Sequence, residues 1–229
     1  MRAETISITV PESGAVSALW QAPAEATACL ALAHGAGAGM THRSMAAIAE
    51  GLERRGVATL RYQFPYMERG GKRVNGPAVA QATVRAAVAE ARARAGGLPL
   101  FAGGRSFGGR MTSQAQAEAP LEDVRGLVFF AFPLHPAGKP GTARATHLQR
   151  VSAPMLFLQG TRDALADAAL LRERTAGLGG RATVHWIEDA DHAFHAPARS
   201  GRSDAELLDE ALDAAVGWME ECGPARDLL

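Results

Sequence analysis

The chain has 229 residues and a mass of 24.0 kDa, enough to bury roughly 70–75% of its unfolded surface without a disulfide or metal. Hydrophobic residues make up 47% and charged residues 21% of the sequence, a balance typical of a globular domain. The 24 basic and 24 acidic residues cancel, so charge favours neither nucleic acid nor an anionic membrane as a partner.

The two cysteines, Cys29 and Cys222, lie far apart, and Cys29 stands within the apolar run 28–32. This placement predicts a buried, reduced thiol and excludes a disulfide framework. The first ten residues alternate like a strand and lack the apolar core of a signal peptide. No stretch approaches the length of about 18 apolar residues that a membrane helix needs. The sequence therefore predicts a cytoplasmic protein.

The first half of the chain carries alternating strand and helix patterns. Ile6, Ile8 and Val10 alternate with polar residues, as on one face of a half-buried strand. The run 27–33 is almost continuously apolar, which is typical of a strand buried on both faces. Further strands are predicted at 15–20, 57–62 and 98–102, and helices at 44–55 and 77–94.

The second half of the chain continues this alternation. A helix is predicted from Phe107 onward, followed by strands at 124–132, 155–159 and 183–187. The last helix has the clearest start, because Ser203 and Glu206 stand at the spacing of a capping box. Its buried stripe is predicted to consist of Leu208, Leu212, Ala215 and Met219.

Two strands with an antiparallel pattern, followed by this alternation, predict an α/β fold. We expect a three-layer sandwich, in which a mixed, mostly parallel sheet is covered by helices on both faces. Neither a repeat, a low-complexity linker nor a shift in composition marks a boundary, so residues 1–229 are predicted to form a single domain. These elements use nearly the whole chain and leave no room for a large lid.

A glycine-rich turn follows one of the predicted strands. Gly104, Ser106 and Gly108 fit the G-x-S-x-G pattern of a nucleophile elbow, which requires a strand before it and a helix after it. A serine on such a strained turn crowds the residues two positions away on each side, so these positions need glycine. Ser106 is the predicted nucleophile. A phosphate-binding loop is excluded, because Arg110 and Met111 occupy its lysine and hydroxyl positions.

The sequence HGAGAG at 34–39 follows a predicted buried strand. In hydrolases with this order of elements, the loop after the third strand supplies one backbone N–H to the oxyanion hole. The residue after the nucleophile supplies the other. We expect Ala36 and Phe107 to be these donors, with Gly35 or Gly37 as alternatives to Ala36.

The general base and its acid partner are expected on the loops that follow the last two strands. Asp163 follows the first of these strands and can fix the tautomer of a histidine on the next loop. His192 follows the last strand and is the predicted base, since a histidine can take the serine proton near neutral pH. Asp167 and His195 are the weaker alternatives. Serine, aspartate and histidine then occur in the order expected of an α/β-hydrolase.

With these motifs the chain resembles the α/β-hydrolase superfamily over almost its full length. The supporting segments are AHGAG at 33–37, GGRSFGGR at 103–110, FPLHP at 132–136, QGTRD at 159–163 and DHAF at 191–194. More narrowly, it resembles the small, lidless, dienelactone-hydrolase-like bacterial proteins, which are also similar to Tex-type domains of eukaryotes. The resemblance implies an eight-stranded sheet and the catalytic triad Ser106, Asp163 and His192. Dienelactone hydrolases carry cysteine at the position of Ser106, so general ester chemistry is expected here.

Two loops after strand ends are expected to line the substrate site, because open α/β sheets bind ligands at this edge. Phe64 and Tyr66 stand on one loop and His135 on the other. We expect the protein to cleave a small carboxylic ester without a cofactor or a metal, as a monomer or homodimer. Amide, thioester or perhydrolysis chemistry on the same triad stays open, as does a non-catalytic scaffold.

Overall fold

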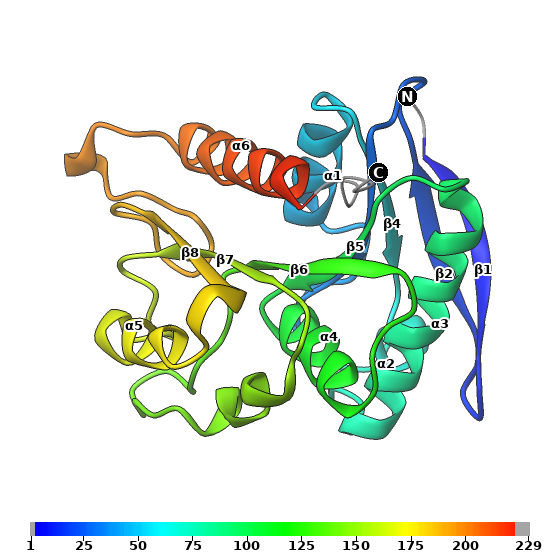
Figure 1. Ribbon diagram of the computed structural model, residues 1–229, viewed down its shortest axis with the longest axis horizontal. Coiled ribbons are helices and arrows are strands. Elements are labelled where there is room, and N and C mark those ends of the chain that lie inside the picture. The colour runs from blue at the N-terminus through cyan, green and yellow to red at the C-terminus, as the bar shows by residue number, and fades with distance from the viewer. Residues whose placement is uncertain (1–2, 223–229) are drawn as a thin grey trace, which may run out of the picture.

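The computed structural model describes residues 3–222 and, over these residues, contains an eight-stranded sheet in the order β1-β2-β4-β3-β5-β6-β7-β8 (Figure 1). β1 pairs with β2 and β2 with β4 in antiparallel orientation, whereas the pairings from β4 through β8 are parallel. The mixed, mostly parallel sheet expected from the sequence is confirmed. The strands are β1 Glu4–Val10, β2 Gly14–Gln21, β3 Ala28–Ala33, β4 Val57–Tyr62, β5 Leu100–Arg105, β6 Val124–Phe130, β7 Met155–Gly160 and β8 Ala182–Ile187.

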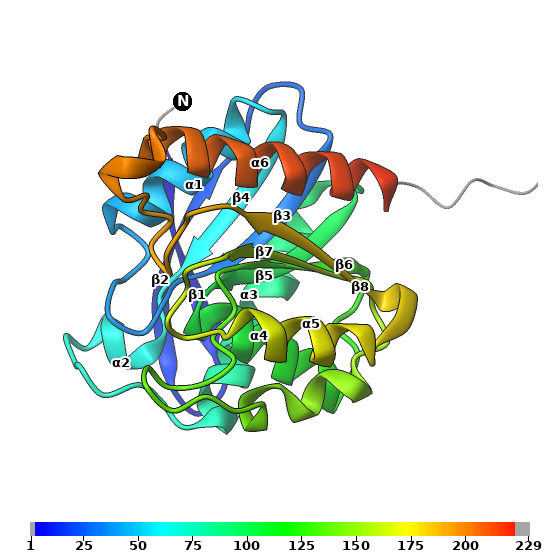
Figure 2. The same cartoon turned by 90° about the vertical axis from the view of Figure 1, so that its left-hand side faces the viewer.

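Helices cover both faces of this sheet and complete three layers. α1 and α6 lie side by side on one face, and α3, α4 and α5 lie on the other (Figures 1 and 2). The α-helices are α1 Arg43–Glu53, α2 Pro65–Glu68, α3 Pro77–Ala95, α4 Phe107–Glu118, α5 Ala168–Ala176 and α6 Asp204–Glu221. Short 3₁₀ helices occur at η1 Ala143–Arg150, η2 Gly179–Arg181 and η3 Ala198–Ser200.

Two buried apolar clusters hold the layers together. One contains Leu52 of α1 and Leu212 of α6, and the other contains Val84 of α3 and Met111 of α4. The central strands β3, β4 and β7 are buried at every residue, whereas β1 alternates between exposed and buried positions near its end. Strands covered on both faces need mainly apolar side chains, which explains the apolar runs in the sequence. Cys29 is among these buried residues, and burial raises the pKa of its thiol to about 12.

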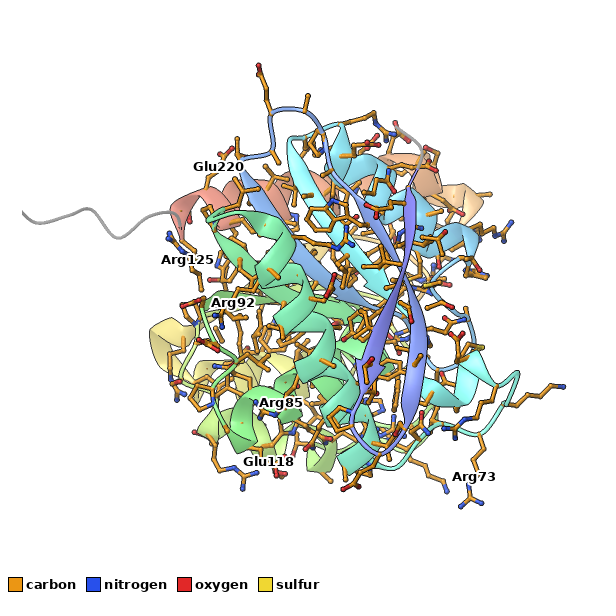
Figure 3. All side chains as sticks on the ribbon, turned by 90° about the vertical axis from the view of Figure 1, so that its right-hand side faces the viewer. Arg73, Arg85, Arg92, Glu118, Arg125 and Glu220 are labelled. Carbon is orange, nitrogen blue, oxygen red and sulfur yellow. The ribbon has the colours of Figure 1, made fainter. Side chains whose placement is uncertain are left out.

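Two arginine side chains join the outer surface of α3 to neighbouring elements. Arg85 donates hydrogen bonds to the carbonyl oxygens of Ala115 and Ala119, at the end of α4. Arg92 pairs with Glu122 and Asp123 in the turn before β6. Both arginines project from α3 in Figure 3. The planar guanidinium group can contact two acceptors at once, so each of these side chains bridges neighbouring elements.

The last helix begins as predicted, but its buried face differs by one residue. Ser203 and Glu206 form a complete capping box. Leu208 was expected on the buried stripe, yet it is only partly buried. Leu207 takes the fully buried position instead, because the helix is rotated so that the stripe contains Leu207, Ala211, Leu212, Ala215, Trp218 and Met219.

The connection between β6 and β7 is more structured than expected. The sequence predicts a strand to position 132, but β6 ends at Phe130, where Ala131 turns the chain with a φ of 58°. The following segment, expected to be a loop, contains η1. Over residues 3–222 no large lid is inserted between the strands, and no helix in that range has the length and apolarity to span a bilayer.

Candidate active site

Four parallel strands bring the predicted site residues to one edge of the sheet. Ser106 follows β5, Asp163 follows β7 and His192 follows β8. The loop at 34–42 follows β3, which pairs with β5. The carboxyl ends of parallel strands meet at the same edge, where α/β folds bind their ligands.

Ser106 stands on a strained turn between β5 and α4. Its φ of 51° and ψ of −115° lie outside the regions that non-glycine residues ordinarily adopt. The turn also packs tightly against the end of β3. A Cβ on Gly108 would lie 2.6 Å from the carbonyl oxygens of Ala33 and His34, and a Cβ on Gly104 would clash with Ala33. The glycine pattern of the sequence therefore has a steric cause.

A continuous chain of hydrogen bonds joins the three predicted triad residues. His192 Nε2 lies 2.8 Å from Ser106 Oγ, and His192 Nδ1 lies 2.7 Å from Asp163 Oδ2. The Asp163 side chain is fully buried, whereas the side chain of His192 is 24% exposed. The imidazole thus reaches the surface at the serine while its acid partner is shielded from water.

Gln159, which was not identified from the sequence, holds the carboxylate of Asp163. Its Nε2 donates to Asp163 Oδ2 over 2.6 Å, and the backbone N–H of Leu165 donates to Oδ1 over 2.7 Å. Gln159 is fully buried near the end of β7. A polar side chain at the end of an apolar run was the available signal, because a buried amide requires a polar partner.

Arg105, immediately before Ser106, connects the elbow to the histidine loop. Its Nη2 donates to the carbonyl oxygen of His192 over 3.3 Å, and its Nη1 lies 3.4 Å from Ser44 Oγ. Burial lowers the pKa of the guanidinium, and the nearby carboxylates of Asp191 and Asp163 oppose that shift. The side chain therefore carries a partly buried positive charge directly beside the triad.

The oxyanion-hole candidates lie on either side of Ser106. A Cβ on Gly35 would lie 3.9 Å from Ser106 Cβ, so this loop passes close to the serine. Ala36 is exposed, and no acceptor in the described part of the chain receives a hydrogen bond from its N–H. Phe107 is the first residue of α4, where backbone N–H groups have no partner within the helix.

His34 lies beneath this loop and is fully buried. Its Nδ1 lies 2.7 Å from the carbonyl oxygen of Gly35, and its Nε2 accepts a hydrogen bond from the N–H of Phe64 over 3.1 Å. These contacts require a neutral ring protonated on Nδ1. Burial lowers the pKa of His34 to about 4, so the ring stays neutral near pH 7.

The residues expected to line the substrate site lie behind its surface. Phe64 is fully buried against the rings of His34 and Phe107. His135 is 4% exposed, with Nδ1 near the carbonyl oxygen of Pro136 and Nε2 accepting from the N–H of Asp167. Packing and backbone hydrogen bonds occupy these two side chains, and their contact with substrate stays a prediction.

Tyr66, the third residue expected to contact substrate, is 5% exposed.

The weaker alternatives for the triad have other partners. Asp167 caps α5 by accepting from the N–H of Leu170, and His195 pairs with Asp204 at the start of α6. The structure thus brings Asp163 and His192, rather than these alternatives, to Ser106.

A second serine–histidine contact lies elsewhere in the fold. Ser113 Oγ of α4 is 2.8 Å from His147 Nε2 of η1, beside a cavity of about 980 Å³ between α3, α4 and η1. Burial, together with the charges of Arg110, Arg150 and Arg174, lowers the pKa of His147 to about 4. No carboxylate pairs with His147 in the part of the chain described, so this contact lacks the acid that the triad has.

Comparison with known proteins identifies the class. A family model described as an alpha/beta hydrolase domain matches residues 26–220, and the chain therefore belongs to the α/β-hydrolase family.

Within residues 3–222, no group of three or more histidine, cysteine, aspartate or glutamate side chains is arranged to hold a metal.

Solved structures share the fold at low sequence identity. A lidless α/β serine hydrolase from Xanthomonas campestris is 20% identical, with 98% of this chain and 97% of that chain covered and a TM-score of 0.74. Dienelactone hydrolase from Anabaena variabilis is 21% identical, with 96% and 97% covered and a TM-score of 0.75. The esterase domain of a Rhodothermus marinus protein is 15% identical, with 96% and 99% covered and a TM-score of 0.72.

Proposed function

We propose that the protein is a serine hydrolase that cleaves a small carboxylic ester. The observation that carries the proposal is the chain of hydrogen bonds from Ser106 through His192 to Asp163, at 2.8 and 2.7 Å. A serine is a weak nucleophile unless an adjacent base removes its proton, and a third group must orient that base. The three residues meet both requirements.

The reaction follows from these roles. Ser106 Oγ attacks the acyl carbon of the ester while its proton passes to His192 Nε2. Asp163 accepts the hydrogen bond from Nδ1 and stabilises the imidazolium that forms. The N–H groups of Ala36 and Phe107 hold the tetrahedral oxyanion. His192 then gives its proton to the departing alcohol, and water releases the acid from the acyl-enzyme by the same steps.

An open site supports a small or flexible ester as substrate. The connections between the strands contain no large lid over residues 3–222, and Ala36 is exposed at the site. Two of the similar structures are described as an esterase domain and a dienelactone hydrolase. An oxygen nucleophile at Ser106 favours ordinary esters over the lactones of the dienelactone hydrolases. Cytoplasmic location, a single domain and a monomeric or homodimeric state stay predictions of the sequence.

Labelling with a fluorophosphonate tests the nucleophile. The wild type should become covalently labelled, and Ser106→Ala should not. Ser113→Ala is the matched control, because it removes a serine that also contacts a histidine Nε2 at 2.8 Å. Labelling of Ser113→Ala should equal that of the wild type. Absence of wild-type labelling, or equal labelling of Ser106→Ala, would contradict the proposal.

A substrate panel separates ester hydrolysis from the other chemistries. We expect turnover of short-chain p-nitrophenyl esters that exceeds turnover of matched amides and thioesters. Loss of the nucleophile lowers turnover by about 10⁶ in a well-studied serine protease, so Ser106→Ala should fall to background. A wild type that turns over none of these compounds yet retains a stable protein partner would favour a scaffold.

A further inference from the structure

The loop at 34–42 carries the predicted oxyanion donor Ala36. The segment after β4 holds this loop by hydrogen bonds on the side that takes no part in the catalytic steps. The hydroxyl of Tyr66, in α2, donates a hydrogen bond to the carbonyl oxygen of Ala36 over 2.7 Å. A longer contact of 3.4 Å joins the same hydroxyl to the carbonyl oxygen of Gly35. His34 Nδ1 lies 2.7 Å from that second oxygen. The carbonyl groups of Gly35 and Ala36 therefore each have a fixed partner.

Fixing a carbonyl group also fixes the N–H of the same peptide. The described peptide bonds are all trans, and in a trans peptide the C=O and the following N–H point in opposite directions. His34 holds the Gly35 carbonyl, so the N–H of Ala36 points away from the ring of His34. Tyr66 also holds the next carbonyl, which stops the adjacent peptide from rotating. The free N–H of Ala36 is thus aimed by hydrogen bonds on the opposite side of the loop.

The ring of Tyr66 contacts the residue that carries the other predicted donor. Its centroid lies 6.4 Å from that of Phe107, with the two rings at 90°. Tyr66 therefore touches both halves of the oxyanion hole, with its hydroxyl on the Ala36 side and its ring on the Phe107 side. One side chain thus contacts both segments that carry the predicted donors.

The backbone of Tyr66 is held by hydrogen bonds, and its hydroxyl keeps its proton. The N–H of Tyr66 donates to Asn75 Oδ1 over 2.9 Å, and its carbonyl oxygen accepts from the N–H of Gly71 over 2.7 Å. Burial raises the pKa of Tyr66 to about 12, so the hydroxyl remains a donor throughout the neutral range. A neutral donor can hold a carbonyl without adding a charge near the oxyanion.

We propose that Tyr66 is a positioning residue of the oxyanion hole: its hydroxyl holds the Ala36 carbonyl, which stops the peptide after Ala36 from rotating and so keeps the N–H of Ala36 facing the reacting oxygen. The inference rests on the proposed function of Ser106. Tyr66 does not touch the reacting atoms, and it acts through the loop. Its effect should therefore appear in the transition state and leave binding of the ground state unchanged.

Tyr66→Phe tests this, because it removes the hydroxyl and keeps the ring against Phe107. Its matched control is Tyr62→Phe, which removes another buried hydroxyl, one that bonds Thr112. Misplacement of a reacting group by about 1 Å can cost 10²-fold, so we expect kcat of Tyr66→Phe to fall about 10- to 100-fold. KM should stay within about threefold of the wild type, as expected for a transition-state effect. Tyr62→Phe should keep the kcat of the wild type.

A boronic acid, which forms a tetrahedral adduct with the serine, gives a second readout. Its affinity for Tyr66→Phe should fall by the same factor as kcat/KM, whereas the affinity of the carboxylic acid product should not change. Equal loss of both affinities, or a kcat equal to that of Tyr62→Phe, would overturn the inference. If wild-type Ser106 is labelled and active in these same samples, such a result concerns Tyr66 alone. If it is neither labelled nor active, the inference falls together with the proposed function.

Discussion

Gln159 Nε2 lies 2.6 Å from Asp163 Oδ2, the same oxygen that accepts from His192. Gln159 belongs to β7, a strand buried at every residue, and Asp163 belongs to the loop beyond it. The acid of the proposed triad is therefore anchored to the sheet itself as well as to its own loop. Anchoring of this kind keeps a catalytic group within the narrow range of positions that the reaction requires.

Gln159→Leu should lower both stability and activity. A hydrogen bond to a charged group contributes about 1.5–3 kcal/mol, so the free energy of unfolding should fall by about that amount. The freed carboxylate can rotate, so kcat should fall while KM changes little. Urea denaturation and steady-state kinetics measure the two effects. The exposed residue Gln149 offers a control, and Gln149→Leu should change stability by no more than about 0.5 kcal/mol. Full activity in Gln159→Leu would contradict the anchoring role.

Gly108→Ala should destabilise the fold, because the new methyl group would lie 2.6 Å from two carbonyl oxygens of the β3 end. Overpacking of this kind costs about 1–3 kcal/mol. Gly217→Ala provides the contrast, since a Cβ at this helical position meets nothing within 4 Å. It should stabilise the protein by about 0.4–1 kcal/mol. Thermal unfolding of both variants tests these expectations. A midpoint temperature of Gly108→Ala equal to that of the wild type would refute the steric account.

The buried ring of His34 should make stability depend on pH. Its pKa is lowered to about 4 by burial, against about 6.5 in an unfolded chain. Between these values the unfolded state binds more protons, so the free energy of unfolding falls as the pH falls through this window. The maximum slope for one such group is about 1.4 kcal/mol per pH unit. Ring ¹⁵N spectra should show a neutral, Nδ1-protonated His34 at pH 6, and a charged ring at that pH would exclude this account.

His195 should contribute to the pH dependence with the opposite sign. The hydrogen bond and charge of Asp204 raise the pKa of His195 in the folded state. Its stabilising contribution is present below the unfolded pKa and is lost as the pH rises through the folded pKa. His195→Asn should therefore reduce stability more at pH 5 than at pH 8. Equal effects of the substitution at the two pH values would argue against the pairing.

Arg105→Met should impair catalysis more than binding. The substitution removes the donor to the carbonyl oxygen of His192 and leaves the loop of the proposed base less constrained. We expect kcat to fall about tenfold, with KM within about threefold, because misplaced catalytic groups act on the chemical step. The exposed arginine Arg54 supplies the matched control, and Arg54→Met should retain wild-type kinetics. Kinetics of Arg105→Met equal to those of this control would rule out the proposed contribution.

The sequence was sufficient to place most strands and helices along the chain, because local patterns mark these elements. Apolar runs such as 27–33 are long enough to mark buried strands, and the capping box at Ser203 marks a helix start without help from the rest of the fold. The rotation of α6 was missed by one residue, with Leu207 buried in place of Leu208. Adjacent leucines both fit an amphipathic helix, and only packing against α1 and the sheet separates them.

The candidate site also contains some residues that local sequence patterns predict and others that they do not. Ser106, Asp163 and His192 could be named because each follows a strand end with a recognisable local pattern. Gln159 lies only four positions from Asp163, and its polar side chain at the end of an apolar run was its one signal. Tyr66 contacts Ala36, 30 positions away, and that contact exists only in the folded chain. Tyr66 was interpreted as a substrate contact from its aromatic character, yet its hydroxyl holds a backbone carbonyl. Residue type alone does not distinguish these two uses.

The hydrogen bond between Ser106 and His192 joins residues 86 positions apart, across β5, β6, β7 and β8. Contacts between such distant residues form late, because the intervening parallel strands must first assemble. Under the proposed function, an unfolded or half-assembled chain contains no activated serine. A brief pulse of fluorophosphonate during refolding would then mark the molecules that have completed the sheet. The amount of labelling at successive times would thus report how far the chain has folded.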